Sequence, residues 1–302
     1  MKKSTDHILQ GIVLAIVATI IWSGNFIVAR KVIQDIQPIT LAFFRWLTAT
    51  VILFPFAFRQ LREDWPTVKK HWPYFAVTAF SGIALFNTFI YVAGHYSPAI
   101  NLALIGTTSS PIMAIALAAV FLHEKIPPAR IAGLAVCIIG ILLLLSGGSL
   151  EKLYHFQFGK GDVYILLGAL AFAVYNTLVK RKPAGIRSMA FLLLVFGWGA
   201  AMLFPGYLWE RAHAAAVVWT PSLWVVLLYL GVGTSVVSYL CWNAAIARLG
   251  TARTALFGNL IPLFASLEAL WLLREKITLL HIVSSLIIVA GLVLANLPSK
   301  KP

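Results

Sequence analysis

Residues 97–146 read SPAINLALIGTTSSPIMAIALAAVFLHEKIPPARIAGLAVCIIGILLLLS. An apolar run carries a proline at Pro111 and ends at Glu124-Lys125, and a second apolar run follows with Gly133 and Gly140. A proline inside an apolar span, followed at a fixed distance by Glu-Lys and then by a small-residue helix, is a pattern that rarely arises twice by chance.

The chain contains this pattern a second time, 151 residues later. The offset carries the proline, the Glu-Lys pair and the second glycine onto Pro262, Glu275-Lys276 and Gly291. It also relates Asn25 to Asn176 and Arg30 to Arg181. A constant offset over nearly the whole chain indicates two tandem repeats of about 150 residues.

Composition places these repeats in a membrane. The 302 residues are 60% hydrophobic and 11% charged, with a mean hydropathy of +0.88, whereas soluble domains are about 25% charged. A membrane-spanning helix needs about 20 apolar residues, and the runs are too long and too unbroken for barrel strands. Ten spanning helices are expected, at 9–29, 38–58, 73–94, 98–122, 128–147, 161–180, 188–208, 222–246, 251–273 and 278–297.

The distribution of basic residues predicts the orientation. With the N-terminus inside, 16 of the 24 Lys and Arg residues fall on inner segments, 7 fall on outer segments, and Arg45 lies within a span. This bias places both termini in the cytoplasm. The first span is a helix and not a cleaved signal peptide, since its apolar run of about 20 residues exceeds a signal core and Arg30-Lys31 follows it.

Five spans in each repeat is an odd number, so the second repeat enters the membrane inverted. The predicted fold is an all-α polytopic membrane protein of one domain, residues 1–302. Repeat one covers 8–147, a linker covers 148–160, and repeat two covers 161–297.

Three motifs resemble the drug/metabolite transporter superfamily, EamA branch. They are Trp22-Ser23-Gly24-Asn25-Phe26, Phe44-Arg45-Trp46 and the duplicated Pro…Glu…Gly pattern, and the resemblance runs from about Gly11 to Leu297. It implies ten helices in two inverted bundles around a central cavity, lined mainly by the first, third and fourth helices of each repeat. It also implies a secondary transporter that exports metabolites such as amino acids from a bacterial inner membrane. The second copy departs from the motif, since Ala173-Val174-Tyr175 replaces Trp22-Ser23-Gly24.

Polar side chains inside the spans are the candidate substrate-binding residues, because such groups usually face a bundle interior or a wet cavity. Aromatic rings with a few amides and hydroxyls suit an amphipathic organic substrate and do not suit a bare ion. The alternative is that these groups only join helices by hydrogen bonds. The candidates are Trp22, Asn25, Asn87, Tyr91, Thr108, Tyr175, Asn176, Ser238, Tyr239, Trp242 and Asn259.

Two prolines and two charges inside spans have competing interpretations. Pro111 and Pro262 each remove a backbone donor, so each is a static kink or a hinge. Arg45 and Glu268 lie at similar depth, which allows a structural ion pair; the sharper hypothesis makes Glu268 a proton-coupling carboxylate.

Further residues have structural interpretations beside functional ones. Glu124-Lys125 and Glu275-Lys276 lie at span ends, where they tie one helix to the next or act as gates. Gly133, Cys137 and Gly140 form a small-residue seam for helix packing or for a homodimer.

Several functions are excluded or kept as alternatives. His123-Glu124 has no second histidine four residues on, and no nucleophile elbow or nucleotide-binding domain occurs, so an enzyme is not expected. No metal, cofactor or nucleic-acid partner is expected; the partners are the lipid bilayer and a small-molecule substrate. Transport of phosphorylated or nucleotide-linked sugars, for which Arg45 is the cationic candidate, remains an alternative, as does a passive facilitator or scramblase.

Overall fold

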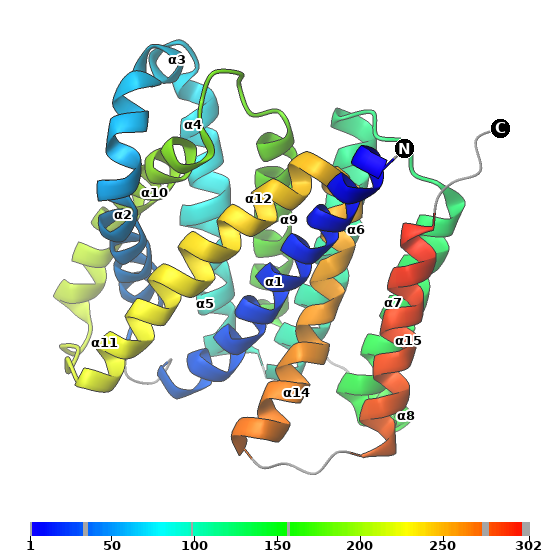
Figure 1. Ribbon diagram of the computed structural model, residues 1–302. Coiled ribbons are helices and arrows are strands. Elements are labelled where there is room, and N and C mark those ends of the chain that lie inside the picture. The colour runs from blue at the N-terminus through cyan, green and yellow to red at the C-terminus, as the bar shows by residue number, and fades with distance from the viewer. Residues whose placement is uncertain (1, 33–35, 98, 156–157, 274–277, 298–302) are drawn as a thin grey trace.

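The computed structural model describes residues 2–32, 36–97, 99–155, 158–273 and 278–297, which form helices joined by short loops (Figure 1). Eight helical segments in this part of the chain are long and apolar enough to cross a membrane, and a shorter apolar helix covers Ile105–Phe121. No strand occurs among the described residues. The predicted all-helical membrane fold is therefore confirmed, while the count of ten spans stays a prediction.

The helices follow the predicted order. Repeat one contains α1 (Lys2–Val32), α2 (Pro38–Glu63), α3 (Trp65–Lys70), α4 (Trp72–Ala79), η1 (Phe80–Leu85), α5 (Phe86–Tyr96), α6 (Ala99–Phe121) and α7 (Pro128–Ser146). The short helix α8 (Leu150–Tyr154) lies in the linker. Repeat two contains α9 (Lys160–Lys180), α10 (Ser188–His213), α11 (Pro221–Leu228), η2 (Tyr229–Val237), α12 (Ser238–Leu249), α13 (Thr251–Ala255), η3 (Leu256–Leu260), α14 (Ile261–Leu273) and α15 (Leu279–Asn296).

Helix ends follow local chemistry. Proline occupies the first or second position of α2, α3, α4, α7 and α11, where its missing N–H leaves no hydrogen bond unmade. Helix α7 stops at Gly147, whose φ of 65° suits glycine. Helices α2 and α10 run about one turn beyond their predicted ends, because long polar side chains can continue a helix past its apolar run at the interface.

Two helix pairs stand at opposite sides of the bundle, α2 with α10 and α7 with α15 (Figure 1). Small residues let α7 and α15 approach closely. A Cβ added at Gly133 would lie 2.5 Å from the Gly291 carbonyl oxygen, and the Cys137 thiol donates to the Ile288 carbonyl oxygen at 3.4 Å. The predicted small-residue seam thus packs α7 against α15 of the same chain, and this contact occupies the surface considered for a homodimer.

The third helix of each repeat contains a π-helical segment. Residues Phe80–Leu85 form η1 between α4 and α5, and Tyr229–Val237 form η2 between α11 and α12. Adding 151 to the bounds of η1 gives positions inside η2. Such wide turns are rare and often mark functional sites. Continuous α-helices were predicted here, and the difference coincides with Gly82, Gly231 and Gly233, which are weak helix formers.

Helices α2 and α10 also hold each other at both ends. Near one end of the pair, Glu210 accepts from the backbone N–H groups of Ile39 and Thr40, at 3.0 and 2.7 Å, in the first turn of α2. At the other end, Asp64 accepts from the backbone N–H of Arg187, the N-cap of α10, at 2.9 Å. Each helix start is thereby capped by a carboxylate from the other repeat.

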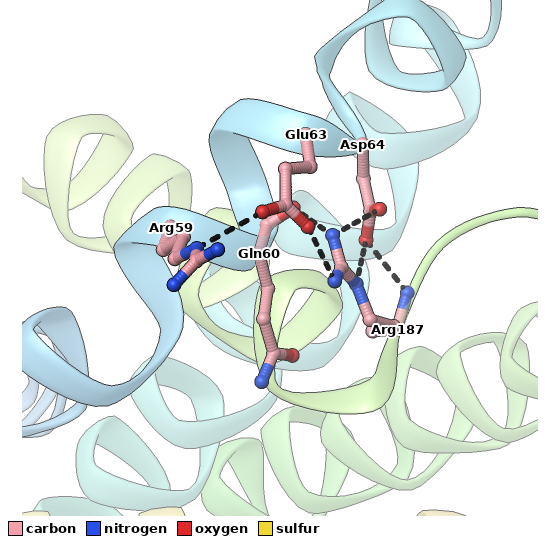
Figure 2. A network of polar contacts seen from close by, with 5 residues as sticks. All are labelled: Arg59, Gln60, Glu63, Asp64 and Arg187. Atoms are coloured by element: carbon pink, nitrogen blue, oxygen red, sulfur yellow. Dashed lines mark hydrogen bonds and ion pairs between the residues drawn. The ribbon is translucent and has the colours of Figure 1, made fainter.

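A network of charges surrounds the Asp64 cap (Figure 2). The Arg187 guanidinium bonds to Asp64 and Glu63 at 2.7 Å each, and Glu63 also accepts from Arg59. Burial alone would raise the pKa of Asp64, but hydrogen bonds from the side chain and backbone of Arg187 hold it below its ordinary value. Side-chain hydrogen bonds to Asp64 and to Glu63 raise the pKa of Arg187. The carboxylate therefore stays charged at neutral pH.

Glu124 makes a third contact of this kind. Its two oxygens accept from the backbone N–H groups of Thr251 and Ala252, at 2.8 and 3.1 Å. Glu124 thus caps the start of α13 in the other repeat. Its repeat mate Glu275, with Lys276, lies outside the described residues.

Candidate functional site

Aromatic candidates from both repeats meet in the middle of the bundle. Trp22 of α1 lies 4.9 Å from Trp242 of α12 and 5.8 Å from Tyr239, measured between ring centroids. Tyr175 of α9 lies 5.5 Å from Tyr239. We call this set, completed by Phe172, the aromatic cluster. Most of its contacts are edge-to-face or tilted, as aromatic pairs prefer.

The aromatic cluster is a packed core and not an open cage. Tyr175, Tyr239 and Trp242 are buried, and their polar atoms have partners within the bundle. Trp242 Nε1 donates to Asn176 Oδ1 at 2.9 Å, and the Tyr239 hydroxyl donates to the Gly82 carbonyl oxygen at 3.2 Å. The predicted residues are therefore brought together, and their closure to solvent is the feature that the sequence did not predict.

A polar cluster surrounds Arg45 beside these rings. Arg45 Nε donates to Ser235 Oγ at 2.9 Å, and Nη1 donates to Asn87 Oδ1 and Tyr91 Oη at 2.9 and 3.0 Å. Nη2 donates to the Thr234 carbonyl oxygen at 3.3 Å. We call Arg45, Asn87, Tyr91, Thr234 and Ser235 the Arg45 cluster. It joins α2 and α5 of repeat one to η2 of repeat two.

The two clusters share atoms. Trp22 Nε1 donates to the Thr234 carbonyl oxygen at 2.8 Å, and the same oxygen accepts from Arg45. The guanidinium also lies 4.9 Å from the ring centroid of Trp46, which itself lies 5.3 Å from Tyr239. An apolar aromatic surface and a buried cation are therefore adjacent, with η2 between them.

Arg45 does not pair with Glu268. No carboxylate of the described residues lies within 4.0 Å of its guanidinium, so the charge is held by neutral oxygens. A cation at the centre of a membrane helix costs about 2.5–3.5 kcal/mol on insertion scales. That cost is met here by hydrogen bonds and a facing indole ring, and not by an opposite charge.

Glu268 lies in a different place, against α1. Its Oε1 accepts from Ser23 Oγ at 2.6 Å, while its Oε2 has no hydrogen-bond partner among the described residues. A Cβ added at Gly24 would lie 3.5 Å from Oε2 and 2.3 Å from the Tyr229 hydroxyl, which donates to the Ile21 carbonyl oxygen at 2.6 Å. Gly24 therefore leaves room for the carboxylate and the phenol to meet at one turn of α1.

The remaining candidates lie outside these two clusters, and two of them donate hydrogen bonds to backbone carbonyl oxygens. Ser238 Oγ donates to the Gly233 carbonyl oxygen at 3.0 Å, and Thr108 Oγ1 donates to that of Ile105 at 3.4 Å. Asn259 is buried with neither amide atom in a described hydrogen bond, and Asn25 Oδ1 also lacks one. Asn25 and Asn176 are repeat mates, yet only Asn176 has a described side-chain partner.

The two candidate hinges differ in geometry. Pro111 lies inside the continuous helix α6, where Ser109 Oγ donates to the Ile105 carbonyl oxygen at 2.5 Å. Pro262 is the second residue of α14, which directly follows the 3₁₀ segment η3. The tighter winding ahead of Pro262 accommodates its missing donor. Motion at either proline stays a prediction.

Four contributors to this region were not predicted from the sequence: Thr234, Tyr229 and the wide turns η1 and η2. Thr234 acts through its carbonyl oxygen, and a backbone atom has no residue-type signal. Tyr229 stands on the same predicted helix as the candidates Ser238, Tyr239 and Trp242, but the π-helical turn shifts its facing direction relative to a regular helix. The two weak helix-forming glycines of η2 were the available signal.

Comparison with known proteins gives a consistent result. Residues 9–146 and 159–297 each match the EamA-like transporter family. An uncharacterized transporter of Archaeoglobus fulgidus is 27% identical over 294 residues, which is 97% of this chain and 98% of that protein.

Two further relatives have more specific names. A probable amino-acid metabolite efflux pump of Escherichia coli K12 is 25% identical, covering 93% of this chain and 92% of that protein. A probable terminal-alkyne amino-acid exporter of Streptantibioticus cattleyicolor is 26% identical, covering 95% and 94%. A solved crystal structure matches with a TM-score of 0.76 at 18% identity, covering 97% of this chain and 96% of that one, which shows a shared fold.

Proposed function

The chain belongs to the EamA-like transporter family, and we propose that it is a secondary transporter that exports small amphipathic metabolites such as amino acids. In this proposal ten helices in two inverted repeats form one membrane domain in a bacterial inner membrane. Rocking of the repeats against each other exposes a central site to one side and then to the other.

The observation that carries the proposal is the meeting of polar and aromatic side chains from both repeats. Helices α1, α2 and α5 of repeat one and α9, η2 and α12 of repeat two supply the aromatic cluster and the Arg45 cluster. Such a combination suits a substrate with an apolar body and a polar end. The amino-acid exporters among the relatives support the same substrate class.

The transport experiment uses the full chain reconstituted in liposomes loaded with radiolabelled amino acids. We expect release of at least one amphipathic amino acid, faster than from protein-free liposomes. Trp242→Phe removes the N–H that donates to Asn176 and should slow release. Trp224→Phe, at an exposed ring on α11, is the matched control and should not. Exchange of sugar phosphates without amino-acid release would instead support the phosphorylated-sugar alternative, and flipping of fluorescent lipid would support a scramblase.

Orientation is the second part of the proposal. The basic-residue bias places both termini in the cytoplasm, and the first turn of α1 and the last turn of α15 lie at the same end of the bundle (Figure 1). An activity reporter fused after Pro302 should therefore read cytoplasmic. A periplasmic reading would contradict this topology.

Glu268 is the proposed proton-coupling group, because its carboxylate is half-buried, touches Ser23 and forms no ion pair with Arg45. Glu268→Gln should abolish export driven by a proton gradient while sparing exchange of substrate down its own gradient. Glu151→Gln, at an exposed position on α8, is the control. If Glu268→Gln still responds to the proton gradient, the coupling role is lost and the transporter assignment stands.

A further inference from the structure

We propose that the Arg45 cluster is an anion site that binds the carboxylate of the transported molecule. The inference rests on the proposed function and deepens it, since it assigns a chemical group of the substrate to named side chains. It requires that the substrate be an acid with one negative charge and an apolar body.

The buried positive charge of Arg45 has no negative partner among the described residues. The Arg45 side chain is 2% exposed, and no carboxylate of the described residues lies within ion-pair distance. Four of its five N–H groups reach neutral oxygens. A buried cation with only neutral partners attracts an anion strongly, because the surrounding medium screens charge poorly. The structure therefore contains half of an ion pair.

The surroundings of Arg45 also contain more hydrogen-bond donors than acceptors. Asn87 is 4% exposed, and its Oδ1 is bonded to Arg45, whereas its Nδ2 interacts with the Tyr239 hydroxyl without completing a hydrogen bond of good geometry. The indole Nε1 of Trp46, whose ring the guanidinium faces, also lacks an acceptor. The Tyr91 oxygen accepts from Arg45, which leaves its own hydrogen available.

These donors specify the kind of ligand. A carboxylate has two oxygens and only accepts, so it would satisfy the amide, the hydroxyl and the remaining guanidinium N–H together. A cation or an amide-terminated ligand would add donors to a site that already has too many. A phosphate dianion calls for more than one positive group, and the Arg45 cluster contains one.

The position of the cluster also fits an amphipathic acid. The Thr234 carbonyl oxygen links Arg45 to Trp22 of the aromatic cluster, so an apolar side chain can lie on the rings while its carboxylate meets the cation. The cluster is closed in this conformation, and η2 supplies the atoms that close it. In the proposal, a change in the winding of η2 admits the ligand.

The decisive experiment compares matched ligands on the full-length protein in detergent, by the shift in thermal unfolding midpoint across a ligand titration. The probes are L-leucine, L-phenylalanine and L-methionine, each beside its carboxamide. We expect the Kd of each acid that binds to be at least tenfold lower than the Kd of its amide. A tenfold difference in Kd corresponds to about 1.4 kcal/mol of binding free energy. This comparison uses the natural protein, so it does not depend on a variant folding.

Two variants separate a binding role from a structural one. Asn87→Asp supplies an internal carboxylate to Arg45, so it should keep or raise thermal stability while removing the preference for acids. Asn87→Leu has the same branched shape and number of side-chain heavy atoms and leaves the cation unpaired, so it should keep that preference at reduced affinity. If Arg45 only holds η2 in place, Asn87→Asp will stabilise the protein and leave ligand preference unchanged.

The outcomes are distinct. Equal binding of acids and amides, or an unchanged preference in Asn87→Asp, overturns the anion site and leaves the transporter proposal standing. Stronger binding of inorganic phosphate than of any acid overturns the carboxylate assignment and favours a phosphorylated substrate. Binding of no probe overturns both the anion site and the amino-acid substrate class.

Discussion

Helices α2 and α10 contact the π-helical segments of opposite repeats, and the two contacts differ in chemistry. Arg45 of α2 bonds to Thr234 and Ser235 of η2. Its repeat mate on α10, 151 residues later, is Phe196, whose ring centroid lies 4.9 Å from that of Trp46 on α2 and 5.6 Å from that of Tyr239 on α12. One copy of the contact holds a charge and the other is apolar.

The close packing in the two contacts is also reversed. A Cβ added at Gly199 of α10 would lie 2.1 Å from Ile83 Cγ2 of η1. On the α2 side the repeat mate of Gly199 is Thr48, and the glycine is instead Gly231 of η2, where a Cβ would lie 2.6 Å from Thr48 Cγ2. The same approach of two backbones is achieved by a small residue on opposite partners.

The duplication preserves the backbone path more strictly than the side chains. Each contact needs one small residue so that a helix can lie against a wide turn, and either helix can supply it. Once that requirement is met, the neighbouring position is free to differ. The η2 side has become the polar side, and the η1 side serves packing.

The largest expected effect comes from making the α2 contact resemble the α10 contact. Arg45→Leu removes a buried charge and leaves the side-chain oxygens of Asn87 and Tyr91 without the donor that they share. We expect transport per folded molecule to fall about 100-fold, or roughly 3 kcal/mol of lost interaction, measured by counterflow in liposomes. Phe196→Leu at the mate position is the control and should cost less than about 1.5 kcal/mol of stability. Equal effects of the two variants would end the distinction between the contacts.

The second effect tests the close approach of α10 to η1. Gly199→Ala places a methyl group into Ile83 and should destabilise the protein by about 1–3 kcal/mol, read from denaturant unfolding in detergent. Ile83→Ala should partly restore stability in the double variant, because it removes the atoms that overlap. Thr48→Ala at the mate position removes a hydroxyl and a methyl group and adds no atoms, so a loss of stability as large as that of Gly199→Ala would contradict this account.

The third effect concerns the caps at the two ends of the α2 and α10 pair. Asp64→Asn keeps an acceptor but loses the charge that Arg187 bonds, and because the Arg187 side chain is 44% exposed, solvent screening should keep the loss near about 1 kcal/mol. The pKa of Asp64 is lowered in the folded state, so its contribution is full above its unfolded pKa of about 3.9. It disappears as the pH falls through the lowered folded value.

Unfolding of the natural protein and of Asp64→Asn should therefore differ at pH 7 and converge in acid. Glu210→Gln, at the other end of the pair, provides the comparison for a cap that bonds to backbone N–H groups and the Thr40 hydroxyl, with no described cation within ion-pair distance. A difference for Asp64→Asn that does not shrink as the pH falls from 7 into the acid range would contradict the assignment of its effect to the carboxylate charge.

The smallest expected effect isolates one hydrogen bond of the Arg45 cluster. Tyr91→Phe removes the oxygen that accepts from Arg45 and retains the ring, so we expect about a fivefold loss of transport, or roughly 1 kcal/mol. Tyr164→Phe is a matched control on α9, where no hydroxyl contact with a described residue occurs. Equal losses in the two variants would remove Tyr91 from the site.

Much of the fold could be predicted from the sequence, because lipid demands long apolar runs and these are visible in composition alone. The site was predictable only in part. The membership of Trp22, Tyr175, Tyr239 and Trp242 in one aromatic cluster followed from their place inside spans and from the family resemblance. Their packing against one another did not, because periodicity specifies a face and not what covers it.

The charges show the same limit. Arg45 and Glu268 lie at similar depth, which favoured an ion pair, yet depth says nothing about lateral position. In the structure Arg45 donates a hydrogen bond to Ser235 of η2, whereas Glu268 accepts one from Ser23 of α1. The caps by Asp64 and Glu210 were not predicted either, since their partners are backbone N–H groups, which every residue type except proline carries.

The reciprocal caps have a consequence for biogenesis. When repeat one leaves the ribosome and enters the bilayer, the amides of Ile39 and Thr40 have no carboxylate, because Glu210 has not yet been synthesised. Asp64 likewise waits for Arg187. The first half of the chain therefore enters the membrane before the groups that complete these two caps exist. The two caps form only after the second half of the chain, with Arg187 and Glu210, has been synthesised.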